Sequence, residues 1–204
     1  MIHDAYPKST IHVLLLPRDP SKTLLHPFVA LADPAFLADV QAKVREVRAL
    51  VAGELRRRFG HLSALERART VALEARMAGE LEEEGQGEGE ETRRQLPPGR
   101  DWEKGVISGV HAGPSMRHLH VHVLSVDRVS EWVRHRKHYN SFATPFLVDV
   151  EEFPLAEGDV RRHPGREGYL RRELRCWRCG VGFGNRFGKL KEHLEVEFKE
   201  WVKE

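Results

Sequence analysis

Three histidines alternate along one short segment of the chain. The run reads His118-Leu119-His120-Val121-His122, so an imidazole recurs at every second residue. Successive side chains of a β-strand point to opposite faces, and we therefore expect the three imidazoles on one face and the apolar residues between them on the other. Neutral imidazoles bind zinc and other transition metals, and they are also nucleophiles toward phosphorus. The spacing leaves both chemistries open. A histidine face with no chemical role is a third interpretation, which strand propensity disfavours.

A second group of reactive side chains lies near the C-terminus. Cys176 and Cys179 form a Cys-x-x-Cys pair, and after thirteen residues His193 follows, then Glu197. His193 and Glu197 are four residues apart, which places them on one face of a helix. Two thiolates, an imidazole and a carboxylate suit tetrahedral zinc. A redox-active pair is the alternative, but no thioredoxin-like strand and helix pattern surrounds it. The pattern predicts one structural zinc ion per chain.

Three segments have the composition of the strands that would carry the histidines. Residues 11–17 are β-branched and leucine-rich and end at Pro17. Residues 105–111 and 119–124 are expected to be neighbouring strands joined by turn residues 113–115. With the helices below, these strands indicate an α+β fold with an antiparallel sheet.

Two helices are expected in the first half of the chain. Asp33 is predicted to be an N-cap, with Pro34 at the first helical position. This is the expected core helix, and the apolar residues that recur with helical spacing and are predicted to face the core are Phe36, Leu37, Val40, Val44, Val47, Leu50 and Val51. A second helix over 63–84 runs into a glutamate- and glycine-rich stretch, and 81–99 is interpreted as a mobile insertion. The expected domains are 1–152 for the histidine strand and 153–204 for the zinc module, with loss of Cys176 unfolding the module alone.

Composition limits the class of protein and its partners. The chain has 204 residues, of which 40% are hydrophobic and 31% charged, and its apolar runs, such as 13–17, are too short to span a bilayer. Its first residues lack the basic and then apolar segments of a secretory signal, so a reducing compartment is expected. The two cysteines are then expected to be thiolates and not a disulfide. Residues 161–192 contain ten Lys or Arg and three acids. This basic segment suits a polyanion such as nucleic acid, although a solvated face is the common alternative.

The residues before the histidine run carry a resemblance to a known family. His111-Ala112-Gly113-Pro114-Ser115-Met116-Arg117, followed by the alternating histidines, resembles the histidine triad superfamily of nucleotide hydrolases and transferases, and its lead resembles the aprataxin branch. Residues 6–17 and 137–142 look like that branch's entry strand and the segment after its triad. The resemblance covers most of the chain except about 52–98. The glutamate at the last position of the zinc motif is similar to fungal aprataxins.

The resemblance implies a DNA-repair hydrolase that removes AMP from adenylated 5′ ends through a covalent histidine-AMP intermediate. It makes His120 the nucleophile, and His118 and His122 orient it and contact phosphate oxygens. It gives His111 a part in proton transfer near the leaving group. The phosphate-binding residues it implies are Lys8, His12, Ser115 and Met116. Adenylated DNA ends, nicks and RNA-DNA junctions are the expected partners, with action in the nucleus as a monomer and no membrane association.

DNA contacts are expected at two places. They are the segment after the triad, with Lys137, His138 and Ser141, and the finger, with Arg178, Arg186, Lys189 and Lys191. The resemblance implies a further helix and strand ahead of Ile2 that help to bind adenine, so the adenine-binding residues stay unassigned. Two alternatives remain: a histidine triad hydrolase of small dinucleotides or phosphoramidates, and a non-catalytic, zinc-dependent DNA-binding module.

Overall fold

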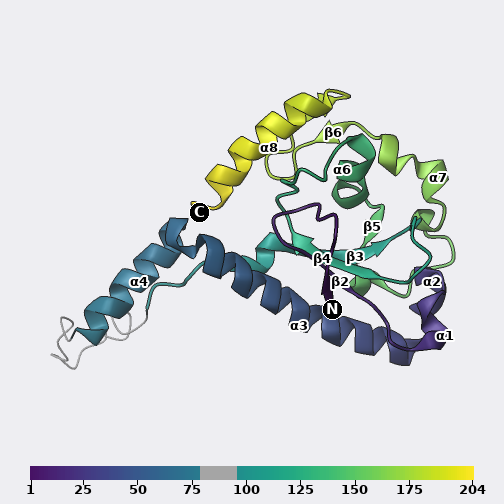
Figure 1. The fold of residues 1–204 in the computed structure, drawn as a ribbon, viewed down its shortest axis with the longest axis horizontal. Helices are drawn as coiled ribbons and strands as arrows, with labels where there is room; N and C mark the ends of the chain where they lie inside the picture. Colours follow the sequence, from purple (N-terminus) through teal and green to yellow (C-terminus); the bar gives the residue numbers. More distant parts are fainter. Residues whose placement is uncertain (79–95) are drawn as a thin grey trace.

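A five-stranded antiparallel sheet forms the centre of the computed structural model, which describes residues 1–78 and 96–204 (Figure 1). The strand order is β1-β2-β4-β3-β5. The strands are β1 (Ile2–His3), β2 (His12–Leu15), β3 (Val106–His111), β4 (Val121–Ser125) and β5 (Leu147–Val148). The predicted α+β class and antiparallel sheet are confirmed, and the three strands predicted from the sequence correspond to β2, β3 and β4.

The register of the strands brings the histidines together. Leu14 on β2 and Gly109 on β3 both pair with His122 on β4. Paired residues in a sheet share a face, so His12, His111 and His122 lie on the same side. Gly109 is required here because a Cβ atom at this position would lie 2.4 Å from the Val148 carbonyl oxygen. A larger residue would push β5 away from β3, and His111 ends that strand.

The long helix α3 (Pro34–Phe59) covers the opposite face of the sheet (Figure 1). The predicted cap is confirmed, because the Asp33 carboxylate accepts hydrogen bonds from the backbone N–H groups of Ala35 and Phe36. The helix buries Leu37, Val44, Val47, Val51, Ala52 and Leu55. The prediction was wrong for Leu50, which is 62% exposed. The buried stripe passes through Val47 and Val51, and Leu50 lies outside it.

The remaining helices are all shorter than α3. They are α1 (Pro20–Thr23), α2 (Pro27–Ala30), α4 (Ala64–Met77), α6 (Arg136–Ala143), α7 (Pro164–Glu167) and α8 (Phe187–Trp201). Short 3-10 turns cover Gly60–Leu62, Trp102–Gly105, Val150–Glu152, Val160–Arg162 and Tyr169–Arg171. Of the insertion expected at 81–99, residues 81–95 lie outside the described part of the chain. Its last residues run along α4, where Arg69 donates a hydrogen bond to the Pro97 carbonyl.

The C-terminal segment forms a small hairpin packed on a helix. Strands β6 (Leu174–Arg175) and β7 (Gly182–Gly184) pair antiparallel beside α8. Their shared core contains Val133, Tyr139, Leu174, Cys176, Leu190 and Leu194. Two of these residues, Val133 and Tyr139, come from the segment that follows the histidine strand. The finger core therefore includes residues from both sides of the predicted boundary between 152 and 153.

The end of α8 returns to the main core. Trp201 is 6% exposed, and its ring centroid lies 6.1 Å from that of Trp102 and 5.8 Å from that of Trp177. The Arg100 guanidinium lies over both Trp102 and Trp201, with its central carbon 4.2 and 4.6 Å from the ring centroids. The start of α4 is held by the C-terminus, because the Ala64 N–H donates to the Lys203 carbonyl. The expectation that the finger folds independently does not match this packing.

Within residues 1–78 and 96–204, no helix has both the length and the apolar composition needed to cross a bilayer.

Candidate functional site: an imidazole cluster and a metal-binding finger

Four imidazoles gather on one face of the sheet, between β2, β3 and the start of β4. The ring centroid of His122 lies 4.5 Å from His111, 4.7 Å from His120 and 5.1 Å from His12. Phe142 on α6 packs over them with its ring 5.0 Å from that of His122. His12 and His122 are buried, and His120 is 6% exposed. The cluster is thus largely screened from water, and His120 also lines an adjoining pocket.

The proton positions on His120 follow from a backbone contact. His120 Nδ1 lies 2.7 Å from the carbonyl oxygen of His118. A carbonyl only accepts, so Nδ1 must carry the hydrogen. In the neutral ring the other nitrogen, Nε2, then holds a free lone pair. His120 is therefore arranged to attack an electrophile through Nε2, and the His118 carbonyl would stabilise positive charge that develops on the ring.

A second chain of contacts fixes the tautomers of His12 and His122. The Lys8 backbone N–H donates to His12 Nδ1 at 3.1 Å, so the neutral His12 ring carries its hydrogen on Nε2. His12 Nε2 in turn lies 2.9 Å from His122 Nδ1 and donates to it. The neutral His122 ring must then carry its hydrogen on Nε2.

Two buried ring nitrogens in the cluster have no partner among the described residues. They are Nε2 of His111 and Nε2 of His122. The nitrogens that His111, His120 and His122 offer lie within 4.8 Å of one another, which also suits a three-histidine metal site. A metal would need a lone pair at His122 Nε2, whereas the His12 contact places a hydrogen there. A donor beside a nucleophilic nitrogen fits a phosphate oxygen better than a cation.

Burial keeps the rings of His12, His111 and His122 neutral. Desolvation lowers the pKa of His12 to about 4 and the pKa of His111 to about 3. It also lowers the pKa of His122 well below the ordinary histidine value, with the neighbouring His111 and His12 adding to the shift. The hydrogen bonds assigned above to neutral His12 and His122 are consistent with the lowered pKa values of these two rings.

Acid should therefore destabilise the fold through the cluster. In the unfolded chain His12, His111 and His122 bind protons below about pH 6.5. In the fold His12 and His111 stay neutral until about pH 4 or below, and the pKa of His122 also lies well below its ordinary value. The unfolded state then binds more protons, so stability is present above pH 6.5 and is lost as pH falls. We expect the free energy of unfolding to fall by about 3 kcal/mol between pH 6.5 and 5.5.

Urea titrations at both pH values, with zinc in excess, measure this change. The His122→Asn variant should show about two thirds of the wild-type pH dependence, because one of three buried imidazoles is gone. His163→Asn, at an exposed position, should keep the full dependence. A free energy of unfolding that is flat over this range would contradict the assignment of neutral rings.

His118 differs from its expected position. Strand β4 begins only at Val121, so the strict alternation does not extend back to His118. Its Nδ1 donates to the Leu119 carbonyl, and its side chain lines a pocket of about 400 Å³ beside His120. Ser115 and Met116 line the same pocket. The structure therefore groups His118 with the predicted phosphate-binding residues, while His12 joins the inner cluster.

Lys8 lies beside the cluster and is half-buried. Desolvation lowers its pKa, the Asp4 carboxylate opposes that shift, and Arg134 adds to it. Its ammonium donates to the Tyr6 carbonyl. Lys8 also contributes to lowering the pKa of both His12 and His122, so it lies within electrostatic range of the rings.

Sequence reasoning missed the two residues that hold this region in place. Asp127 is fully buried and accepts hydrogen bonds from Thr10 N–H and Val129 N–H, and burial raises its pKa. Arg128, at a φ of 51°, is also buried, and its guanidinium donates to the Phe142 carbonyl at 2.6 Å. Their only sequence signal is two charged residues directly after a buried strand. They tie the Lys8 segment and α6 to the end of β4.

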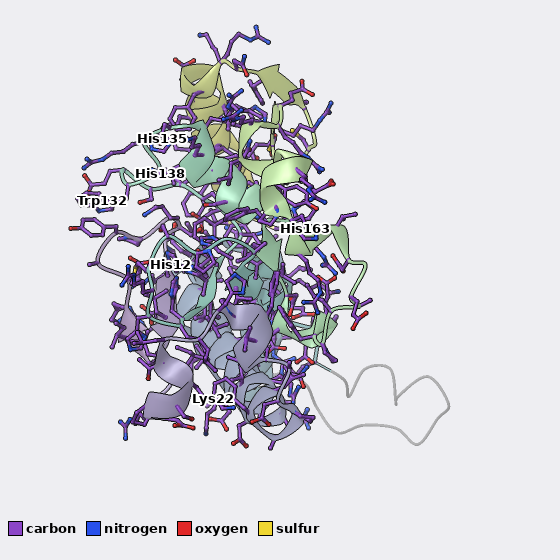
Figure 2. The ribbon with its side chains drawn as sticks, turned by 90° about the vertical axis from the view of Figure 1, so that its right-hand side faces the viewer. His12, Lys22, Trp132, His135, His138 and His163 are labelled. Carbon is purple, nitrogen blue, oxygen red and sulfur yellow. The ribbon has the colours of Figure 1, made fainter. Side chains whose placement is uncertain are left out.

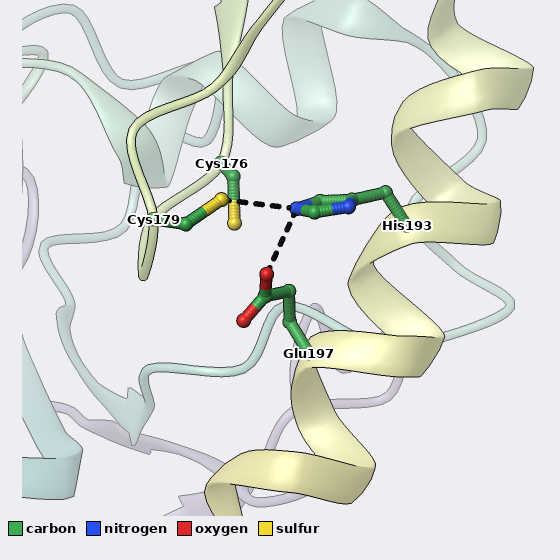
Figure 3. A group of neighbouring side chains, drawn as sticks. All are labelled: Cys176, Cys179, His193 and Glu197. Atoms are coloured by element: carbon green, nitrogen blue, oxygen red, sulfur yellow. Dashed lines mark hydrogen bonds and ion pairs between the residues drawn. The ribbon is translucent and has the colours of Figure 1, made fainter.

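The predicted metal ligands converge in the finger (Figure 3). Cys179 Sγ lies 3.1 Å from His193 Nε2, and the same nitrogen lies 3.2 Å from Glu197 Oε1. The ligand atoms of all four residues, with Cys176, lie within 4.8 Å of one another. Ligands at 2.0–2.3 Å from a tetrahedral zinc ion are separated by about 3–4 Å, so the donor set and its spacing fit zinc.

The cations predicted to contact DNA lie in different surroundings. Arg178 pairs with Glu197 Oε2 at 2.6 Å and with Glu204, and it holds the pKa of Glu197 below its ordinary value. This contact leaves Glu197 Oε1 facing His193. Lys189 pairs with Glu192 on the exposed side of α8, and Arg186 donates to the Phe183 carbonyl. Lys191 is half-buried on α8.

The residues predicted after the triad lie on α6. Lys137 is exposed, His138 is half-buried, and Ser141 donates to the His138 carbonyl. Burial and the neighbouring His135 lower the pKa of His138. Their roles in DNA binding remain predictions.

Comparison with known proteins agrees with both parts of this description. A family profile described as the HIT domain matches residues 1–129, and a profile for the C2HE / C2H2 / C2HC zinc-binding finger matches residues 143–200. An aprataxin-like protein of Schizosaccharomyces pombe is 30% identical over 99% of this chain and 72% of its own length. An aprataxin-like protein of Saccharomyces cerevisiae is 41% identical over 46% of this chain and 44% of its own.

Solved structures give the same result. The crystal structure of the aprataxin ortholog Hnt3 from Schizosaccharomyces pombe aligns with a TM-score of 0.69 at 27% identity, over 98% of this chain and 81% of that one. Hnt3 in complex with DNA aligns with a TM-score of 0.67, over 98% and 82% of the two chains. The fold and the site thus define a histidine triad domain fused to a zinc-binding finger. The chain belongs to the aprataxin family.

Proposed function

We propose that this protein removes AMP from adenylated 5′ ends of DNA, with His120 as the nucleophile. The observation that carries the proposal is the contact between His120 Nδ1 and the His118 carbonyl, which leaves a lone pair on Nε2 beside the two unpartnered ring nitrogens. A related protein, Hnt3, has been crystallised with DNA and with DNA and guanosine. A protein of the same fold therefore binds DNA, and binds guanosine together with DNA.

The reaction divides into two displacements at one phosphorus. In the first, His120 Nε2 attacks the AMP phosphorus, an N–P bond forms, and the P–O bond to the DNA 5′-phosphate breaks. The leaving 5′-phosphate departs as an anion and needs little help from an acid. In the second, water attacks the same phosphorus and breaks the N–P bond, which releases AMP and a proton and restores His120.

The surrounding residues supply electrostatic stabilisation. His122 Nε2–H is placed to donate to a non-bridging phosphate oxygen, and the Lys8 ammonium offers a counter-charge. His111 is the candidate for proton transfer near the leaving group, and Ser115 and Met116 line the adjoining pocket. These groups are fixed before substrate binds, because His12 orients His122 and Asp127 anchors the Lys8 segment.

The finger is proposed to hold one zinc ion through Cys176, Cys179, His193 and Glu197. The metal would fix the hairpin against α8 and so set the position of the basic C-terminal segment. Phosphate contacts from such a surface position DNA without reading its sequence, as an enzyme specific for broken ends requires. A nuclear location and a monomeric state follow as expectations from this substrate.

A choice between substrates tests the function. Incubation with a nicked duplex carrying a 5′-adenylate is expected to yield AMP and a 5′-phosphorylated strand, with kcat/KM at least about a hundredfold above that for a diadenosine polyphosphate. The DNA around the nick provides binding energy that a small dinucleotide lacks. Equal or better use of the dinucleotide would instead support a small-molecule hydrolase. No AMP from either substrate would support the non-catalytic alternative.

A further inference from the structure

A single peptide group links His120 to a segment outside the histidine run. The carbonyl of the peptide between His118 and Leu119 accepts from His120 Nδ1 at 2.7 Å. The N–H of the same peptide donates to the Thr23 carbonyl at 2.8 Å. A hydrogen bond at its N–H end polarises a peptide group and strengthens its carbonyl as an acceptor. Thr23, at the start of the α1–α2 connection (residues 23–27), thus fixes the group that orients His120.

The helix that carries Thr23 is anchored to the start of α3. Thr23 is the last residue of α1, where helix carbonyls lack a partner within the helix. Lys22 Nζ lies 2.7 Å from the Asp33 carboxylate and 5.5 Å from the centroid of the Phe36 ring. In Figure 2, Lys22 marks α1 at the bottom of the view, below His12. The Thr23 carbonyl therefore has a fixed place beneath the histidine face.

His26, in the α1–α2 connection, contacts the residue that follows strand β3. Desolvation lowers the pKa of His26, and a hydrogen bond with the Ala112 backbone opposes this shift. His26 Nδ1 accepts from the Phe28 N–H at 3.2 Å, so the neutral ring carries its hydrogen on Nε2. The Ala112 N–H already donates to the Phe146 carbonyl at 2.8 Å. The His26 ring therefore donates through Nε2 to the Ala112 carbonyl.

The α1–α2 connection thus contacts the segment between β3 and β4 at both of its ends. The first contact is at Ala112, which follows His111. The second is at Leu119, which precedes His120. Residues 24–27 also line the pocket that adjoins His120. A displacement of the connection would move both ends of this segment together with the acceptor for the His120 ring.

We propose that His26 is a positioning residue for the reaction at His120. It holds the α1–α2 connection against Ala112, which keeps the Thr23 carbonyl on the peptide that orients the nucleophile. Both nitrogens of the His26 ring are engaged with the backbone, so it acts through His120 and not on the phosphate. The inference rests on the proposed function in taking His120 as the nucleophile. It adds a residue outside the histidine run and the turn before it.

Asparagine and glutamine separate the two hydrogen bonds of His26. Asparagine can accept in the place of Nδ1 but has no donor at the place of Nε2, whereas the glutamine amide can donate there. His26→Asn is expected to slow formation of the protein–AMP bond in a single turnover about tenfold, because a small displacement of a nucleophile is costly. His26→Gln should stay within about threefold of wild type. Affinity for the adenylated nick should change by less than about twofold in either variant.

His61→Asn and His61→Gln are the matched controls, because His61 is an exposed histidine away from the α1–α2 connection. Both should react at the wild-type rate. Wild-type rates in His26→Asn would overturn the proposal. It would also be overturned if His26→Gln were as slow as His26→Asn or slower, since His26 would then serve only to cap α2.

The tautomer of His120 gives a measurement that does not depend on turnover. Nitrogen NMR spectra of wild type and His26→Gln should show the hydrogen on Nδ1, whereas His26→Asn should show a mixture of both tautomers. A slow rate in His26→Asn with an unchanged tautomer would overturn the proposal. If the tautomers differed as expected but wild type released no AMP, the proposed function would be wrong and the positioning role would stand. If wild type released AMP and His26→Asn kept its rate and tautomer, only the positioning role would be wrong.

Discussion

Replacing His120 with alanine is expected to lower the rate of AMP release from an adenylated nick by about a thousandfold or more. The variant keeps His111, His122 and the Lys8 ammonium, but it lacks the nitrogen that forms the bond to phosphorus. In enzymes with a covalent intermediate, loss of the nucleophile leaves only the rate that binding and electrostatic stabilisation provide. The residual activity should therefore be small while DNA affinity stays close to wild type.

The covalent intermediate gives a direct measurement. With label in the AMP group, a wild-type reaction stopped within milliseconds to seconds should leave label on the protein, in an acid-labile phosphoramidate bond. The His120→Ala variant should carry none. His163→Ala serves as the matched control, because it removes an exposed histidine far along the chain from the cluster. It should form the intermediate at the wild-type rate.

Stability must be checked in the same variants, because His120 is largely buried. Its ring lies 4.7 Å from that of His122, and its removal leaves a small cavity between the cluster and the adjoining pocket. His120→Asn fills more of this space and should be equally inactive. Label that persisted on either folded variant would show that another residue is the nucleophile.

Local signals in the sequence predicted much of the scaffold. The cap at Asp33 with Pro34 after it marked the start of α3, and the position of the cap does not depend on the rest of the fold. The alternating residues 119–124 predicted a strand with a buried apolar face, and Leu119, Val121 and Val123 are indeed buried. Likewise the Cys-x-x-Cys pair and the spacing of His193 and Glu197 predicted a finger that the family comparison supports.

Long-range pairing could not be predicted in the same way. The contact between His12 and His122 depends on the register of β2 against β4, which joins residues 110 positions apart. The buried position of Asp127 depends on the same pairing, because two of its hydrogen bonds come from Thr10. Leu50 was misjudged because periodicity alone does not say how wide the buried stripe of a helix is.

Docking of the finger is the largest feature that the sequence did not reveal. Trp201 meets Trp102 across a separation of about a hundred residues, and no local pattern predicts such a contact. Trp177 packs on Trp201 from the finger. This packing changes what the metal is expected to do. A finger that only tethered a basic helix would leave the catalytic domain intact on loss of zinc, but here the end of α8 lies in the main core.

Removal of the metal is therefore expected to destabilise the whole chain. Without zinc the hairpin and α8 lose their main link, because such a small module cannot fold on its core alone. The Trp201 and Val202 side chains would then leave the core around Trp102. We expect thermal unfolding to move down by about 10 °C or more on chelation, still as one transition.

Cys179→Ala tests this expectation with little change in packing, because Cys179 is exposed. It should lose zinc, lower the midpoint of unfolding and reduce the protection of α3 amides, such as that of Leu55, against hydrogen exchange. Val196→Ala, at an exposed position on α8, should do none of these. If the Leu55 amide exchanged at the wild-type rate in Cys179→Ala, the finger would fold independently of the main core, as the sequence predicted.

The zinc content of the same variants bears on the imidazole cluster as well. Wild type and His120→Ala should both hold one zinc ion per chain, whereas Cys179→Ala should hold none. A second ion in wild type that disappeared in His120→Ala would mean that the cluster binds metal, and the hydrogen on His122 Nε2 would then be assigned wrongly. The stability of the fold depends on the finger, whereas the nucleophilic lone pair belongs to the imidazole cluster. The two sites should therefore respond separately. Loss of zinc weakens the fold, and loss of His120 stops the reaction in a fold that remains stable.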